Sequence, residues 1–228
     1  LVERLWGTTN SFHFSATGDL TMTPYDIAVL TGLDLGGWPI QYDEDMGQWE
    51  AAWIYLLGAR PPVDRASGRV RYTWFSSHFR RVEMEPGTPD EAAQYARGFL
   101  MFLLGTTLFA DRGNTVGLYL LSALVDLSQV KRYDWGGAGL ATLYCYMSAT
   151  SRRRGDLLGG YWRAWEVLSA LLIYISTPHY LHIAHTVHFI LCIVHFALST
   201  SYSALVSTVV GLCVFSDIGP GVDGCVTS

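Results

Sequence analysis

Charged residues are distributed unevenly along this chain, and the break in their distribution constrains the fold more than any single motif. All 15 lysine and arginine residues precede Glu166, and after it the only charged side chains are Asp217 and Asp223. A folded soluble domain normally carries charged residues on its surface throughout its length. We therefore predict two regions, residues 1–166 and residues 167–228.

Signals for the starts of helices recur within the first region. Thr23-Pro24-Tyr25-Asp26 and Thr88-Pro89-Asp90-Glu91 each place a capping threonine before a proline, with an acidic residue three positions after the threonine. They predict one helix that ends at Gly32 and another that runs to about Phe109. Further helices are expected over residues 44–57, 71–82, 118–127 and 136–151, and one more begins at Tyr161.

A short β-hairpin is expected near the N-terminus. Residues 12–14 and 20–22 are apolar at alternate positions and flank the turn-rich segment 15–19. Taken together, the patterns predict a mainly α fold, a multi-helix globular domain with a small N-terminal β-hairpin. We expect the apolar C-terminal tail that follows to be helical.

Motifs of the common enzyme classes are missing from the sequence. There is no P-loop, GxGxxG, GxSxG or HExxH motif. Lys131 is the only lysine and has no glycine-rich phosphate loop beside it, which argues against pyridoxal-phosphate chemistry. The acidic run at residues 43–45 opens a predicted helix, where acidic residues complement the helix dipole. We therefore expect a protein that is not an enzyme, with no catalytic residue, cofactor or metal site.

Arginines gather in two stretches of the first region. They predict either a patch that binds phosphate or an acidic partner, or solvated loops and helix ends, and we favour the second interpretation. The formal net charge of −5 gives no broad attraction for nucleic acid, and direct nucleic-acid binding stays open. The residues of the candidate patch are Arg65, Arg69, Arg71, Arg80, Arg81, Arg152, Arg153 and Arg154.

Four stretches of the first region follow one another in a characteristic order. They contain FHF and LTMTPYDIAVLTGL within residues 12–33, YARGFL and LFAD within 95–111, RYDWG and LATLY within 132–144, and GG with two tryptophans within 159–166. In this order and spacing they resemble the plant mobile domain, also labelled aminotransferase-like, which typifies the MAINTENANCE OF MERISTEMS family. The label aminotransferase-like gains no support from the sequence, because its only lysine, Lys131, has no glycine-rich phosphate loop beside it.

The resemblance implies a mainly helical, nuclear plant protein without established catalysis. Members of the family occur in transposons and as host proteins associated with meristem maintenance, genome stability and transposon silencing. Some act with plant serine/threonine phosphatases. The resemblance therefore predicts a non-enzymatic protein-interaction domain with protein partners, among them a plant serine/threonine phosphatase. It also predicts that the domain is truncated at both ends, and it assigns no catalytic residue because the matched motifs consist of caps, packing glycines and core aromatics.

Two interpretations give the second region a function. Residues 180–198 carry no formal charge and approach the length of a membrane-spanning helix, so residues 167–215 could anchor the protein in a membrane instead of the nucleus. The histidines within this segment make that costly. Residues 179–195 contain five histidines, which suggests a metal-dependent enzyme, but one helix would bring only His188 and Cys192 to the same ion.

A third interpretation treats residues 167–228 as sequence that did not evolve with the domain. The resemblance stops in the middle of a predicted helix, and the sequence beyond it is apolar, nearly uncharged and rich in serine. Translation past a missed splice site would produce such a tail. We favour this third interpretation.

Overall fold

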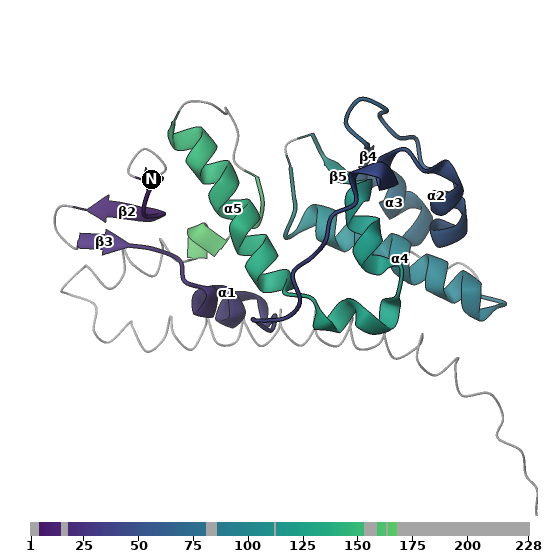
Figure 1. Ribbon diagram of the computed structural model, residues 1–228, viewed down its shortest axis with the longest axis horizontal. Helices are drawn as coiled ribbons and strands as arrows, with labels where there is room; N and C mark the ends of the chain where they lie inside the picture. The colour runs from purple at the N-terminus through teal and green to yellow at the C-terminus, as the bar shows by residue number, and fades with distance from the viewer. Residues whose placement is uncertain are drawn as a thin grey trace, which may run out of the picture.

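Helices dominate the chain, which confirms the predicted mainly α fold class (Figure 1). No helix among the residues described is long and apolar enough to cross a membrane. The predicted tail, its membrane and metal alternatives and its expected helix lie outside these residues, apart from Val167. The computed structural model describes residues 5–14, 18–80, 86–111, 113–152, 159–162 and 164–167.

Three short antiparallel strands form a sheet near the N-terminus. Their order is β1 (Leu5–Trp6), β2 (Ser11–Phe14) and β3 (Gly18–Leu20), and the pairing of β2 with β3 confirms the predicted hairpin. β1 was not predicted, because two residues are too few to show an alternating pattern. Phe12 is buried under the sheet with its ring edge-to-face on Trp165, 4.5 Å between ring centroids.

The two Thr-Pro signals start helices at the predicted residues. In α1 (Pro24–Thr31), the Thr23 hydroxyl accepts a hydrogen bond from the Asp26 backbone N–H at 3.2 Å, and the Asp26 carboxylate accepts one from the Thr23 N–H at 2.7 Å. This reciprocal pair is a capping box. Thr88 caps α4 (Pro89–Thr106) through its hydroxyl.

The helix predicted over residues 44–57 is broken into two pieces. A short 3₁₀ helix, η2 (Glu44–Gly47), is followed by α2 (Glu50–Leu57). Gly47 packs against the backbone of Gly68, and a Cβ on Gly47 would lie 3.0 Å from the Gly68 Cα. A larger residue at Gly47 would crowd the Gly68 backbone, and residues 48 and 49, between the two pieces, are not helical.

Two other predicted helices are shorter than expected, and one pair of strands was missed. The segments predicted at 71–82 and 118–127 contain α3 (Tyr72–Phe79) and a 3₁₀ helix, η3 (Leu118–Leu124). A second 3₁₀ helix, η4 (Leu127–Arg132), follows. β4 (Arg69–Arg71) pairs antiparallel with β5 (Thr115–Gly117), so Arg71 ends a strand where a helix start was predicted.

Helix α5 (Trp135–Ser151) lies between two hydrophobic cores (Figure 1). It begins as predicted, because the Asp134 carboxylate accepts a hydrogen bond from the Gly137 N–H at 2.7 Å. One core joins α2, α3, α4, the β4–β5 pair and η3 to the start of α5. The other joins the N-terminal sheet and α1 to the second half of α5 and to Trp165. Residues 164–167 form a helical turn inside the helix predicted from Tyr161.

Candidate functional site

Arg97, in the YARGFL stretch, holds parts of the scaffold together. Its guanidinium donates to three backbone carbonyls: from Nε to Leu124 at 2.9 Å, from Nη2 to Val125 at 3.0 Å and from Nη1 to Leu56 at 3.4 Å. Carbonyls at the end of a helix lack partners within the helix. Arg97 therefore satisfies the ends of α2 and η3 at once, and its role is structural.

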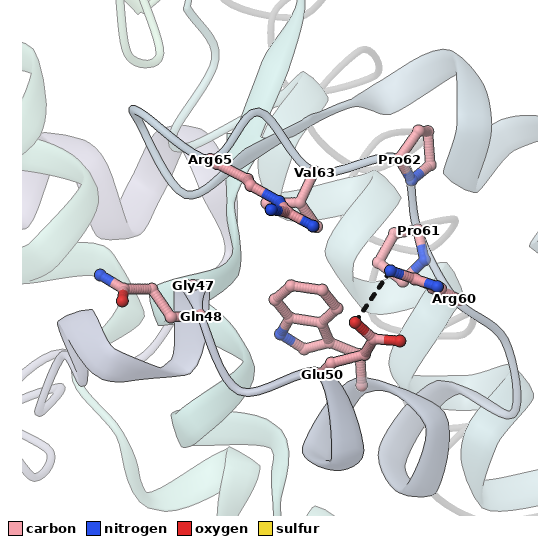
Figure 2. Close-up of a pocket in the computed structure, with 9 residues that line it drawn as sticks. Gly47, Gln48, Glu50, Arg60, Pro61, Pro62, Val63 and Arg65 are labelled. Atoms are coloured by element: carbon pink, nitrogen blue, oxygen red, sulfur yellow. Dashed lines mark ion pairs between the residues drawn. The ribbon is translucent and has the colours of Figure 1, made fainter.

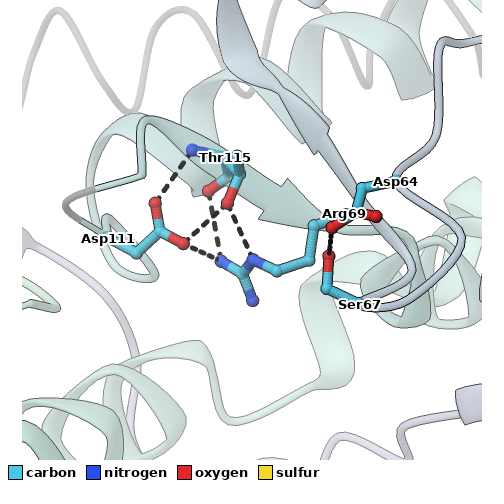
Figure 3. Close-up of polar contacts among 5 residues, drawn as sticks. All are labelled: Asp64, Ser67, Arg69, Asp111 and Thr115. Carbon is cyan, nitrogen blue, oxygen red and sulfur yellow. Dashed lines mark hydrogen bonds and ion pairs between the residues drawn. The ribbon is translucent and has the colours of Figure 1, made fainter.

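Arg69 has a similar role at the β4–β5 pair (Figure 3). Its Nη2 donates to the Asp111 carboxylate at 2.5 Å and its Nε donates to the Thr115 hydroxyl at 2.8 Å. Asp111 also accepts hydrogen bonds from the backbone N–H and the hydroxyl of Thr115, at 2.8 and 2.7 Å. The Arg69 and Asp111 side chains are only 22% and 14% exposed. This network fixes the end of the LFAD stretch to both strands.

Tyr144, in the LATLY stretch, clamps the segment between β3 and α1 onto α5. Its hydroxyl donates to the Met22 carbonyl at 2.9 Å and accepts from the Met22 N–H at 3.0 Å. The same hydroxyl lies 2.6 Å from the hydroxyl of Thr21. One side chain thus pairs both backbone polar groups of Met22, whose side chain is buried in the second core.

The RYDWG stretch is crossed by the loop that leads from α1 to η2. The Trp38 N–H donates to the Arg132 carbonyl at 2.6 Å, and the Asp134 N–H donates to the Trp38 carbonyl at 2.8 Å. The Arg132 guanidinium lies over the Trp38 ring, 5.2 Å from its centroid, in cation–π geometry. Stretches that resemble the family therefore supply hydrogen bonds between separate elements of the scaffold.

The five described arginines of the candidate patch lie in different surroundings. Arg69 is bonded into the network at Asp111, Arg71 is exposed at the end of β4, and Arg80 is exposed at the C-terminal cap of α3. Arg152 donates from Nε to the Ser148 carbonyl at 3.1 Å, at the negative end of α5 where its charge was predicted to be favourable. Arg81, Arg153 and Arg154 lie outside the described residues.

Arg65, the remaining member of the patch, lines a surface pocket of about 480 Å³ beside the start of α2 (Figure 2). Arg60 lies on another side of the same pocket, and its Nη2 pairs with the Glu50 carboxylate at 2.9 Å. Both side chains of this ion pair are substantially exposed, at 60% and 43%. The pocket thus has two guanidinium groups and one carboxylate. Its full lining is Gly47, Gln48, Glu50, Trp53, Arg60, Pro61, Pro62, Val63 and Arg65.

Trp53, Pro61, Pro62 and Val63 are the apolar side chains of the pocket, and Gln48 adds an amide. The indole of Trp53 is held in place because its Nε1 donates to the Met46 carbonyl at 2.6 Å, and the residue is only 6% exposed. Pro61, which is buried, and Pro62 fix the backbone of the loop that leaves α2. These residues form a small rigid apolar wall, while most of the surface that lines the pocket is polar.

Arg65 lies in a tight turn that begins at Asp64, and the contact of Asp64 with Ser67 in this turn is drawn in Figure 3. The Asp64 carboxylate accepts hydrogen bonds from the Ser67 hydroxyl at 2.6 Å and from the Ala66 N–H at 3.1 Å, and the Gly68 N–H donates to the Asp64 carbonyl at 2.8 Å. The hydrogen bond from Ser67, and then that from Ala66, lower the pKa of Asp64 below its ordinary value. The neighbouring carboxylate is therefore engaged in the turn, and no hydrogen bond or ion pair joins Arg65 to another described residue.

The other groups with a shifted pKa do not line this pocket. Burial raises the pKa of Tyr42, Tyr95 and Tyr146, and hydrogen bonds from Ser128 lower the pKa of Asp126. Within the described ranges, no group of three or more histidine, cysteine, aspartate or glutamate side chains is placed to hold a metal ion.

Sequence reasoning placed Arg60 and Arg65 in one arginine-rich stretch but did not identify the other residues of the pocket. Gln48, Glu50 and Trp53 were assigned to one continuous helix, which would have spaced them along its surface. One signal in the sequence could have revealed the pocket. Gly58 ends the helix and two prolines follow it, and the loop that contains them passes the start of the same helix.

Comparisons with known proteins agree with the resemblance. A family model described as "Plant mobile domain" matches residues 1–186, past the boundary predicted at Glu166. The chain is 30% identical over 165 residues to the protein MAINTENANCE OF MERISTEMS of Arabidopsis thaliana, an alignment that covers 70% of this chain and 34% of that protein. It is also 33% identical over 178 residues to a "Serine/threonine-protein phosphatase 7 long form homolog" of the same plant, covering 74% of this chain and 13% of that protein.

A further relative is MAIN-LIKE 2 of Arabidopsis thaliana, which is 34% identical over 146 residues, 63% of this chain and 21% of that protein. The chain therefore spans about a third or less of the length of these relatives. No solved structure matches it.

Proposed function

The chain belongs to the plant mobile domain family, and from that premise we propose that it is a non-catalytic protein-interaction domain of a nuclear plant protein. Its proposed role is to support meristem maintenance, genome stability and the silencing of transposable elements through the proteins it binds. The name of the relative MAINTENANCE OF MERISTEMS supports the first of these roles. The structural use of Arg97, Asp111 and Tyr144 supports the absence of catalysis, because these motif side chains are bonded within the scaffold.

The observation that carries this proposal is the surface of α2. After Glu50 at its start, the helix consists only of apolar and aromatic residues, but only one side of it packs into the core, through Trp53, Leu56 and neighbouring residues. Ile54 and Tyr55 face outward with 49% and 75% of their surface exposed. A helix that is apolar on all sides is normally covered. We call Ile54 and Tyr55 the outer face of α2 and propose that a protein partner covers it.

We propose a plant serine/threonine phosphatase as that partner. The relative named as a serine/threonine-protein phosphatase homologue aligns with this chain over 13% of its own length. A domain of this type therefore occurs inside a longer protein that carries the phosphatase name. We propose that the domain of the present chain makes the same kind of contact with a phosphatase.

Capture of phosphatase activity tests the proposal. The full chain is immobilised, incubated with plant nuclear extract and washed, and the bound serine/threonine phosphatase activity is measured on a phosphopeptide. The double variant Ile54→Lys/Tyr55→Lys should lose the captured activity, because it places two charges in the contact. Tyr25→Lys is the matched control, since Tyr25 is 73% exposed on α1. Equal capture by the double variant and the control, or no captured activity with the unmodified chain, would refute this function.

A further inference from the structure

We propose that the pocket beside α2 binds a phosphorylated serine or threonine side chain of a peptide, with the Arg65 and Arg60 guanidiniums as its phosphate ligands (Figure 2). The inference rests on the proposed function in one respect, namely that the peptide belongs to a protein partner. The pocket itself is separate from the outer face of α2, because its lining includes neither Ile54 nor Tyr55.

Arg65 supplies the primary positive charge. Its side chain is exposed and reaches the pocket from the turn that follows Val63. Because the carboxylate of Asp64 is engaged with Ser67 and Ala66, the nearest acid in the sequence does not neutralise it. A planar guanidinium donates two parallel hydrogen bonds to phosphate oxygens. Arg65 is therefore a preformed phosphate ligand on a fixed loop.

The ion pair between Arg60 and Glu50 makes the site selective for phosphate. A peptide carboxylate that approached Arg60 would only replace the carboxylate of Glu50, one single charge for another. A phosphomonoester carries about −1.5 to −2 charges and three acceptor oxygens, so it can bridge Arg65 and Arg60 together. Glu50 thus competes with the ligand for Arg60, and a singly charged ligand gains little binding free energy by replacing it.

The apolar wall suits the residues that flank a phosphorylated side chain. Trp53 and the two prolines present a rigid surface between the guanidinium groups. The volume of about 480 Å³ is within the usual range for a small-ligand pocket, roughly 300–1,000 Å³. It accommodates the modified residue with part of its neighbours. Nucleic acid fits less well, since its binding spreads over many phosphates and basic residues, and this pocket has two arginines.

Fluorescence anisotropy with the purified full chain tests the proposal. The probe is a labelled degenerate heptapeptide library with phosphoserine at its centre, compared with the same library containing serine or glutamate there. We expect the phosphoserine library to bind at least about tenfold more tightly than the glutamate library. Arg65→Gln should weaken binding by roughly 10- to 100-fold, the usual effect of losing hydrogen bonds to a charged group. Arg71→Gln, an exposed arginine outside the pocket, is the matched control and should leave binding unchanged.

Glu50→Gln provides a second readout that a merely structural role would not produce. Removing the internal competitor should tighten binding of the phosphoserine library and should raise binding of the glutamate library even more, so that selectivity falls. Equal binding of the phosphoserine and serine libraries, or an Arg65→Gln variant that binds like the control, would overturn the proposal. Complete displacement of the library by an equimolar amount of inorganic phosphate would also overturn it, because the site would then recognise free phosphate and not a peptide.

The two proposals fail in different ways. The Ile54→Lys/Tyr55→Lys variant should still bind the phosphoserine library, since neither residue lines the pocket. If that library binds through Arg65 but no phosphatase activity is captured from extract, the proposed partner is wrong and the phosphate site stands. If phosphatase activity is captured but the phosphoserine library does not bind through Arg65, the proposed partner stands and the phosphate site is wrong.

Discussion

Replacing Tyr144 by phenylalanine should separate the N-terminal segment from α5 while leaving the packing of the ring in place. The substitution removes one hydroxyl, which pairs with the N–H and the carbonyl of Met22 at 3.0 and 2.9 Å. The ring contact with Trp165, 6.4 Å between centroids, needs no hydroxyl and should persist. The change therefore isolates the hydrogen bonds from the hydrophobic contribution.

The size of the effect follows from the groups that lose their partner. Each hydrogen bond between partly buried groups contributes about 0.5–1.5 kcal/mol net, so the two bonds to Met22 together are worth about 2 kcal/mol. The contact with Thr21 should add little, because its hydroxyl is exposed and also donates to the Asn10 carbonyl at 2.7 Å. For a domain of this size, a loss of about 2 kcal/mol lowers Tm by roughly 4–8 °C.

Urea denaturation and amide hydrogen exchange measure this prediction together. Tyr144→Phe should lower the free energy of unfolding, and the amide of Met22 should lose protection more than amides in the first core. Tyr25→Phe is the control, because Tyr25 is 73% exposed and should give a change near zero. If the two variants were equally stable, or if the Met22 amide kept its protection, the assignment of Tyr144 as a clamp would be refuted.

Two other substitutions test the packing and the turn. Gly98→Ala should destabilise the fold by about 1–3 kcal/mol in thermal unfolding, because the added methyl group meets the Phe79 ring and overpacks the core; an unchanged Tm would contradict that contact. Ser67→Ala should raise the pKa of Asp64 toward its ordinary value, since the Ser67 hydroxyl is the largest cause of its lowering. A carboxylate whose pKa is lower in the folded than in the unfolded state stabilises the fold at pH values above its unfolded pKa. This stabilisation is lost as the pH falls through the folded pKa. The variant should therefore be less stabilised by Asp64 above about pH 4. An NMR titration of Asp64 that is identical in both proteins would count against the turn.

Local signals along the sequence were sufficient where a single residue determines a boundary. Thr23 and Thr88 start helices because their hydroxyls pair with backbone N–H groups only three residues away. Gly58, at φ 68°, ends α2 because the left-handed conformation there costs glycine little. Asp134 caps α5 for the same local reason as the threonines.

Features that depend on distant parts of the chain could not be predicted in this way. Gly47, just before the break, packs against Gly68, and β4 pairs with β5, more than 40 residues further along the chain. The arginines illustrate the same limit. Arg65 and Arg69 are four residues apart in the sequence. Arg69 is hydrogen-bonded to Asp111, whereas Arg65 lines a surface pocket. The number of arginines in a stretch of sequence does not show which of them hold the scaffold together and which line a surface pocket. Their hydrogen-bond partners in the structure show it.

Helix α2 contributes to both proposed contact surfaces, with Glu50 in the pocket and Ile54 and Tyr55 in the outer face. Glu50 and Tyr55 are five residues apart, about 7.5 Å along the axis of α2 at 1.5 Å per residue, so a single partner that covers the outer face can also reach the pocket. If the captured phosphatase inserts a phosphorylated residue there, treating the extract with a broad phosphatase before capture should weaken binding to the unmodified chain. The same treatment should leave unchanged whatever binding the Arg65→Gln variant retains, because that variant no longer recognises the phosphate. An equal loss in both proteins would mean that phosphorylation acts elsewhere on the partner, and a loss in neither would mean that the two surfaces bind different molecules.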